Sequence, residues 1–317
     1  MIRENNVADL IFHHYQNSPF SQKIRSILGF KQLAWKSVEI PNIMPKPDVV
    51  ALTGGYRRTP ILQIGADIYC DSALIADVLE RLAATPTLYP PACEGTARTL
   101  AQWADFNMFW CAIAYCFQPA GAKNIFAGAS QEQMQAFAAD RMPFRANLPR
   151  MSVAEASGHL YEMVRRMESM LASGNEYLLG AQASIADFSV YHSIWFIRDV
   201  AQVPAVLEAA PHLSRWADRM AAFGNGERSR FTSADALAVA RSSKTEDLSS
   251  RPVIDFHGIA LGSAVTIGAA DYGMDPVQGE LVLSDANEWA VRRRDDRAGE
   301  VVVHFPRLGF QMKKVET

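Results

Sequence analysis

The stretch Ser18-Pro19-Phe20-Ser21-Gln22-Lys23-Ile24-Arg25 follows the apolar run Leu10-Ile11-Phe12 and marks the place where a predicted strand gives way to a predicted helix. Ser followed by Pro suits a helix N-terminus, because Ser caps the helix and Pro at the first helical position loses no needed donor. The unpaired N–H groups at such a terminus carry about half a unit of positive charge and favour an anionic sulfur or oxygen. This junction is therefore the first candidate for a functional site.

The first part of the chain, from Asp9 to Leu82, alternates between strand and helix patterns. Apolar alternation predicts the strands, and apolar residues at helical spacing predict the helices. The stretch 41–58 is rich in Pro and Gly and is expected to be irregular. The predicted order is strand 10–14, helix 18–30, strand 35–40, hairpin 61–69 and helix 72–82. This βαβ unit followed by ββα indicates an α/β domain over residues 1–85.

The middle of the chain changes to long helical windows after Pro90. The predicted helices cover residues 96–117, 131–140, 152–173, 185–197 and 211–223. Consecutive amphipathic helices without strands indicate an all-helical bundle, which we place at residues 90–240.

The last part of the chain begins after a polar linker, 241–252 (RSSKTEDLSSRP). Short apolar segments separated by Gly, Asp, Asn and Pro predict strands at 264–267, 280–283, 289–291, 301–305 and 310–312. We expect residues 252–317 to form a small, closed, mostly antiparallel β-barrel. The charged run 292–297 (RRRDDR) is interpreted as a solvated hairpin tip rather than a nucleic-acid site.

Composition describes an ordinary globular protein of 317 residues with a formal net charge of −3. This balance argues against nucleic acid or a membrane surface as the main partner. No apolar run approaches the ~20 residues needed to span a bilayer, so a cytoplasmic protein is expected. The spacings of Cys70, Cys93, Cys111 and Cys116 suit neither a zinc site nor a disulfide framework. No metal site is predicted.

Four segments together resemble the cytosolic glutathione transferase superfamily. They are SPFSQKIR at 18–25, RRTPILQIG at 57–65, DSALIADVL at 71–79 and SIADF at 184–188. The resemblance covers about residues 9–231 and implies a thioredoxin-like N-terminal domain followed by a helical bundle, the glutathione transferase fold. It also implies glutathione as co-substrate, a homodimer, and a role in detoxification.

The resemblance assigns parts of glutathione to particular residues. Asp71 and Ser72 would receive the γ-glutamyl amine and carboxylate at a helix N-terminus. A cis bond between Thr59 and Pro60 would turn the Thr59 amide toward the cysteinyl backbone. Lys46 and Arg58 are candidates for the glycine carboxylate. The thiol would then lie near Ser18, whose hydroxyl can stabilise the thiolate nucleophile.

Each of these roles has an alternative. Ser18 and Ser72 can both be simple helix caps, and Tyr15 can supply the hydroxyl to sulfur in place of Ser18. Ser21 stands where a redox motif would carry its second Cys, so disulfide exchange at this site is not expected. Ser184 and Asp187 have capping-box spacing and are interpreted as structural.

The aromatic helix 103–115 is expected to be mainly core, but it would also line the electrophile pocket in the family. We predict Phe20, Phe106 and Trp110 as pocket residues. The resulting hypothesis is a transferase that joins the glutathione thiolate to a small hydrophobic electrophile. The rivals are a catalytically weak glutathione- or protein-binding module, and a glutathione-dependent isomerase or dehalogenase. The C-terminal strands can cover the active site, extend a dimer interface or bind a partner.

Overall fold

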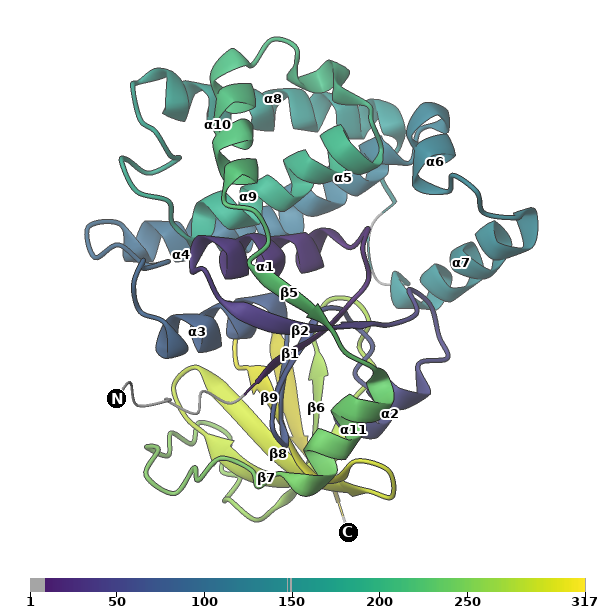
Figure 1. The fold of residues 1–317 in the computed structure, drawn as a ribbon, viewed down its shortest axis with the longest axis vertical. Helices are drawn as coiled ribbons and strands as arrows, with labels where there is room; N and C mark the ends of the chain where they lie inside the picture. The colour runs from purple at the N-terminus through teal and green to yellow at the C-terminus, as the bar shows by residue number, and fades with distance from the viewer. Residues whose placement is uncertain (1–8, 147, 149, 317) are drawn as a thin grey trace.

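The computed structural model describes residues 9–146, 148 and 150–316. Residues 1–8 of the first predicted domain and residue 317 of the third therefore lie outside the described residues. Figure 1 shows the helices α4 to α10 gathered at one end of the long axis and the C-terminal strands at the other. The N-terminal strands lie between them, with α1 and α3 facing the helical end.

The N-terminal domain has the predicted βαβ–ββα order. Its elements are β1 (Leu10–His14), α1 (Pro19–Phe30), β2 (Ala34–Glu39), α2 (Pro47–Thr53), β3 (Ile61–Ile64), β4 (Asp67–Cys70) and α3 (Ser72–Leu82). Strand β1 pairs in parallel with β2 and antiparallel with β3. The expectation of an irregular stretch 41–58 is wrong in part, because α2 forms there. Pro47 begins that helix, and Gly54 ends it at φ 79°.

The helical bundle contains α4 (Glu94–Trp103), α5 (Phe109–Cys116), α6 (Pro119–Ile125), α7 (Gln131–Phe144), α8 (Val153–Ala172), α9 (Ile185–Trp195) and α10 (Pro211–Ala222). Residues predicted as one helix, 96–117, are divided by the π-helical turn η1 (Ala104–Met108). A second π-helical turn, η2 (Phe196–Val200), follows α9, and a 3-10 turn, η3 (Pro204–Leu207), precedes α10. Helix α9 is buried along residues 185–194 and forms the centre of the bundle.

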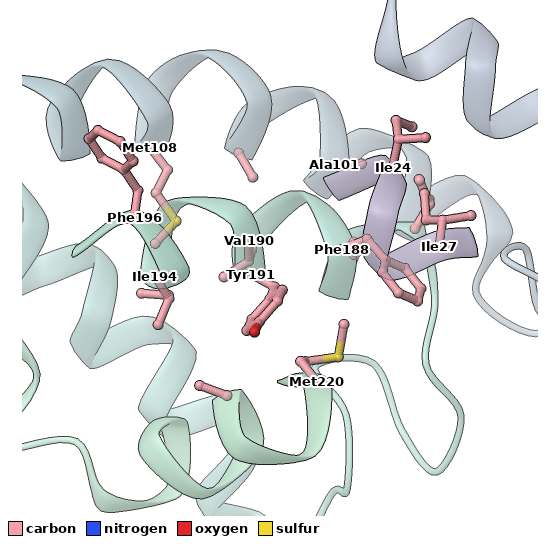
Figure 2. Packing of buried hydrophobic residues seen from close by; sticks show 14 of the residues in the cluster. Ile24, Ile27, Ala101, Met108, Phe188, Val190, Tyr191, Ile194, Phe196 and Met220 are labelled. Carbon is pink, nitrogen blue, oxygen red and sulfur yellow. The ribbon is translucent and has the colours of Figure 1, made fainter. Parts of the chain in front are cut away.

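Both faces of the sheet are covered. Because side chains alternate along a strand, Leu10 and Phe12 face α1, α3 and the bundle, while Ile11 faces the other core. Figure 2 shows the first core from close by: Ile24 and Ile27 of α1 lie on one side of α9, and Met220 lies on the other. The N-terminal domain and the helical bundle therefore share one hydrophobic core.

After α10 the chain returns to the sheet. Strand β5 (Glu227–Arg230) pairs in parallel with β2, and α11 (Ser233–Ser242) packs against α2 and β9. Gly29 makes this return possible, because a Cβ there would lie 2.4 Å from the Gly224 carbonyl oxygen. The stretch 227–242, which the sequence pattern groups with the bundle, thus packs on the strand layer.

The C-terminal strands are present as predicted: β6 (Ala264–Ala269), β7 (Val277–Ser284), β8 (Glu288–Asp295), β9 (Gly299–Pro306) and β10 (Phe310–Lys314). They do not form a separate closed barrel, which corrects that part of the expectation. Strand β9 pairs in parallel with β4, and one ten-stranded sheet results in the order β10-β6-β7-β8-β9-β4-β3-β1-β2-β5. Without β9, the edge of β4 would leave backbone N–H and C=O groups unpaired. The continuous apolar run of β9 is typical of a strand in the interior of a sheet.

A buried charged cluster lies at the seam between β4 and β9. His304 stands between two carboxylates, with Nδ1 2.6 Å from Glu288 Oε1 and Nε2 3.1 Å from Asp67 Oδ1. Burial opposes a charged imidazole, but the hydrogen bonds to these carboxylates outweigh it and raise the pKa of His304. Burial likewise opposes ionisation of Glu288, yet His304 and Arg251 hold the pKa of this carboxyl at about 2. The seam is therefore joined by ionic as well as backbone contacts.

Candidate functional site

Ser18 lies at the N-terminus of α1 and lines a cavity of about 910 Å³. Its backbone is extended (φ −79°, ψ 119°), and its hydroxyl oxygen accepts a hydrogen bond from the Ser21 N–H at 3.2 Å. The side chain therefore caps the helix and also faces the cavity. Tyr15, the alternative hydroxyl, lines the same cavity, so both remain candidates for contact with a sulfur atom.

A second cavity, of about 930 Å³, adjoins the first and contains the predicted anchoring turn. Asp71, Ser72 and Pro60 line it, and the Thr59–Pro60 peptide bond is cis. Asp71 adopts φ 77° at the N-terminus of α3, where its carboxylate accepts the Ala73 N–H at 2.9 Å. Burial raises the pKa of this carboxyl, against the effect of the Arg58 guanidinium.

Three of the predicted residues border both cavities and join them into one region: Phe20, Arg58 and Thr59. Lys46 lies on the Ser18 side, where its ammonium group donates to Thr59 Oγ1 at 3.2 Å. Burial lowers the pKa of Lys46 to about 8. The structure thus places the turn at Asp71–Ser72, the cis bond and the α1 junction in one connected region.

Three titratable residues at or beside this site were missed by sequence reasoning: Lys23, Asp105 and His192. The Lys23 ammonium group lies 2.6 Å from Asp105 Oδ2 and 3.4 Å from Ser72 Oγ. His192 Nε2 lies 3.1 Å from the other Asp105 oxygen. Burial opposes ionisation of Asp105, but Lys23 and His192 outweigh it and lower the pKa of the carboxyl. No local signal pairs these residues, because they come from α1, η1 and α9.

Arg58 has partners that the sequence did not predict. Its Nε donates to the Tyr272 carbonyl oxygen at 3.0 Å, and its guanidinium forms an ion pair with Asp271. The guanidinium carbon also lies 3.8 Å from the centroid of the Tyr272 ring. If Arg58 holds a glycine carboxylate as predicted, it does so while also contacting Asp271 and Tyr272. Lys46 has no carboxylate partner among the described residues and is the freer of the two candidates.

The loop between β6 and β7 contributes directly to the site. Tyr272 lines both cavities and packs edge-on against Trp110 and Phe144, at centroid distances of 5.0 and 5.2 Å. The neighbouring residue must be small, because a Cβ on Gly273 would lie 2.5 Å from Phe144 Cε2. Its N–H donates to the Phe144 carbonyl oxygen at 3.0 Å. The C-terminal strands therefore form part of the wall of the site.

The three predicted electrophile-pocket residues do not all face the same space. Phe20 lines both cavities. Trp110 lines only the Ser18 cavity, whereas Phe106 lines only the cavity that contains Ser72 and is 37% exposed. Phe106 and Trp110 are four apart and would share a face of a regular α-helix. The π-helical turn η1 changes the helical register between them.

Ser184 and Asp187 line neither cavity. The Asp187 carboxylate accepts hydrogen bonds from the Ser184 N–H and hydroxyl, the Leu178 N–H and the Trp216 indole, at 2.9 to 3.0 Å. The pair thus joins the start of α9 to α10, which is a structural arrangement.

Within residues 9–146, 148 and 150–316, no cluster of His, Cys, Asp and Glu is suited to hold a metal ion. Over the same residues, no helix combines the length and apolar character that a membrane span requires.

The glutathione S-transferase N-terminal domain family matches residues 12–87, and the glutathione S-transferase C-terminal domain family matches residues 150–219. A GST-like protein from Pseudomonas syringae is 41% identical, with a TM-score of 0.82 over 97% of this chain and 100% of that chain. The chain belongs to the glutathione S-transferase superfamily. A comparison with curated protein sequences finds no significant match.

More distant members of the superfamily share the fold of part of the chain. A glutathione S-transferase from Rhodospirillum rubrum F11 is 17% identical, with a TM-score of 0.51 over 67% of this chain and 87% of its own. Glutathione transferase F2 from Populus trichocarpa is 15% identical, with a TM-score of 0.51 over 67% of this chain and 93% of its own. The Pseudomonas syringae protein covers 97% of this chain, so its match includes C-terminal strands.

Proposed function

We propose that the protein is a glutathione transferase that activates the thiol of glutathione for attack on a small hydrophobic electrophile. The observation that carries the proposal is the connection of two cavities, one with Ser18 at a helix N-terminus and the other with Asp71 and Ser72 at a second helix N-terminus. Glutathione is long and charged at both ends, so such a connected region suits its shape.

The charged ends of glutathione have matching groups in this region. The γ-glutamyl carboxylate would accept hydrogen bonds at the N-terminus of α3, with the Ser72 hydroxyl and the Lys23 ammonium group close by. The γ-glutamyl amine would pair with Asp71. The glycine carboxylate would pair with Lys46, a buried cation on the Ser18 side.

With both ends held in this way, the thiol would lie near the N-terminus of α1. A hydroxyl hydrogen bond from Ser18 and the positive end of the helix would stabilise the thiolate. The thiol proton passes to solvent. The sulfur then forms a bond to the electrophilic carbon, and the leaving group departs with its electron pair.

The experiment that tests this proposal combines binding with turnover. Glutathione should raise the melting temperature of the protein, since a ligand of the native state stabilises it. Ser18→Ala should lower turnover of an activated aryl chloride by about a hundredfold, by analogy with the loss of one donor to a developing anion. Ser18→Thr, which keeps a hydroxyl, is the matched control, and Tyr15→Phe tests the alternative.

The outcomes separate the rival functions. Unchanged turnover in Ser18→Ala, with a large loss in Tyr15→Phe, would transfer the role to Tyr15. A melting shift without turnover of any electrophile would favour the binding module. Turnover limited to isomerisation or dehalogenation would favour the third hypothesis.

We also propose that the protein is a homodimer. The edge of β4 is already paired with β9 of the same chain, so a second copy would pack through side-chain surfaces rather than extend the sheet there. Sedimentation equilibrium measures the mass of the assembly, and a monomer at micromolar concentration would contradict the proposal. The cytoplasmic location, which rests on the lack of a long apolar run, and the detoxification role, which rests on the resemblance, stay predictions.

A further inference from the structure

The cavity beside Ser18 has an unbalanced charge. None of the described residues that line it is an Asp or Glu. The charged lining residues are all cations: Lys46, Arg57, Arg58, Arg141, Arg145 and Arg150. Asp140, which lies outside the lining, pairs with Arg57 and Arg141 at 2.7 and 2.8 Å. Arg58 pairs with Asp271. Lys46, Arg145 and Arg150 have no carboxylate partner among the described residues.

Two buried hydrogen-bond donors of this cavity have no acceptor. They are Nε of Arg145 and Nε1 of Trp110, and neither has a hydrogen-bond partner among the described residues. The two side chains are neighbours, since the Arg145 guanidinium carbon lies 4.9 Å from the centroid of the Trp110 ring. Both groups can only donate. Buried donors are rarely left unpaired, so this corner suits an oxygen acceptor, and its positive charge favours an anionic one.

The rest of the wall is aromatic. Phe20 packs against Phe109 with their ring centroids 4.6 Å apart, and Trp110 meets Tyr272 at 5.0 Å with their planes at 90°. Rings arranged at such angles offer faces and edges to a further flat ring. An apolar pocket with a few convergent polar groups is typical of a small-molecule site.

We propose that this cavity binds an aromatic acid as the second substrate. Its ring would lie among the aromatic side chains, and its carboxylate would accept hydrogen bonds from Arg145 and Trp110. The assignment of this ligand as the second substrate rests on the proposed function. Binding of the acid itself does not, because it needs no turnover. The two glutathione carboxylates are accounted for at Ser72 and Lys46, which leaves Arg145 for the second ligand.

The test measures binding of an unreactive matched pair, 4-nitrobenzoate and its neutral analogue 4-nitrobenzamide, by titration calorimetry. S-methylglutathione is present at saturation, so that the carboxylate sites of glutathione are filled. The acid should bind about tenfold more tightly than the amide, as expected for a charge-assisted hydrogen bond in a buried site. Arg145→Gln should remove this preference by lowering the affinity for the acid and leaving the affinity for the amide unchanged.

Two further variants complete the design. Arg215→Gln changes an exposed arginine outside both cavities and should leave both affinities unchanged. Trp110→Phe keeps a ring but removes the indole donor, and it should weaken the acid more than the amide. It also keeps the test decisive if Arg145→Gln fails to fold.

Equal affinity for acid and amide in the wild type would overturn the inference, as would a preference that survives both Arg145→Gln and Trp110→Phe. Loss of acid binding on addition of S-methylglutathione would place the acid in the glutathione site and would also overturn it. Acid binding without glutathione-dependent turnover would instead contradict the proposed function and leave this site assignment standing.

Discussion

The Arg58 guanidinium lies over the ring of Tyr272, 3.8 Å from its centroid, although the two residues are 214 positions apart in the chain. Arg58 precedes the cis Thr59–Pro60 bond, and Tyr272 belongs to the loop between β6 and β7. This contact connects the C-terminal strands to the two cavities of the site. Of the three roles left open for these strands, it favours a covering of the site.

Replacement of Tyr272 by Ala should impair both stability and the use of the electrophile. The ring is buried against Trp110 and Phe144, and truncation of a buried aromatic side chain costs about 3–5 kcal/mol when the cavity cannot collapse. Urea unfolding measures the loss, and steady-state kinetics should give a higher KM for the electrophile. Tyr272→Phe keeps the ring and is the control. An unchanged KM for the electrophile in Tyr272→Ala would contradict a role for Tyr272 in the wall of the electrophile cavity.

Lys23→Met should destabilise the protein by about 3 kcal/mol, because it leaves the partly buried Asp105 carboxylate without its cation. It should also weaken glutathione binding, since the ammonium group lies 3.4 Å from Ser72 Oγ. The matched control is Lys31→Met, which breaks a comparable ion pair with Glu80 at 2.7 Å, remote from both cavities.

Lys31→Met should therefore lower the free energy of unfolding without changing the glutathione Kd of the folded protein. If both variants weaken glutathione equally, the effect of Lys23 is structural and its assignment to the binding site fails.

Asp187→Ala should lower the free energy of unfolding by at least about 2 kcal/mol, because it leaves buried N–H donors of Leu178 and Trp216 without acceptors. Turnover per folded molecule should be unchanged, since Asp187 lines neither cavity. Chemical denaturation and active-site-normalised kinetics separate the two effects. A fully stable Asp187→Ala variant that has lost turnover would contradict the structural role of Asp187.

The cluster around His304 should make stability depend on pH. Its pKa is raised in the folded protein, so its contribution is complete below the unfolded value of about 6.5 and is lost as pH rises through the folded pKa. The difference in unfolding free energy between wild type and His304→Gln should therefore shrink as pH increases above about 6.5. Glu288, whose pKa is about 2, stays ionised throughout this range.

His159→Gln, at an exposed position, provides the comparison for His304. Urea titrations at several pH values measure each variant. A difference between wild type and His304→Gln that stays constant from pH 6 to 9 would show that the imidazole is not held in its charged form.

Local patterns predicted most of the elements because the forces that set them act over a few residues. The cap at Ser18, the turn before Ser72 and the Ser184–Asp187 spacing each concern one helix terminus. Apolar spacing does not reveal the π-helical turn η1, which places Phe106 at the cavity that contains Ser72 and Trp110 at the cavity that contains Ser18. Helix α2 was not predicted because Pro and Gly, which stand at its two ends, are equally typical of loops.

Local sequence patterns were enough to predict that helices begin at Ser18 and Ser72 within a thioredoxin-like domain. Three contacts could be seen only in the folded chain: Lys23 meets Asp105, β9 extends the sheet at β4, and Tyr272 covers Arg58. Capping and periodicity depend on neighbours in the chain. Contacts between distant segments depend on how complete layers pack, and no local pattern specifies which edge or cavity a remote segment will fill.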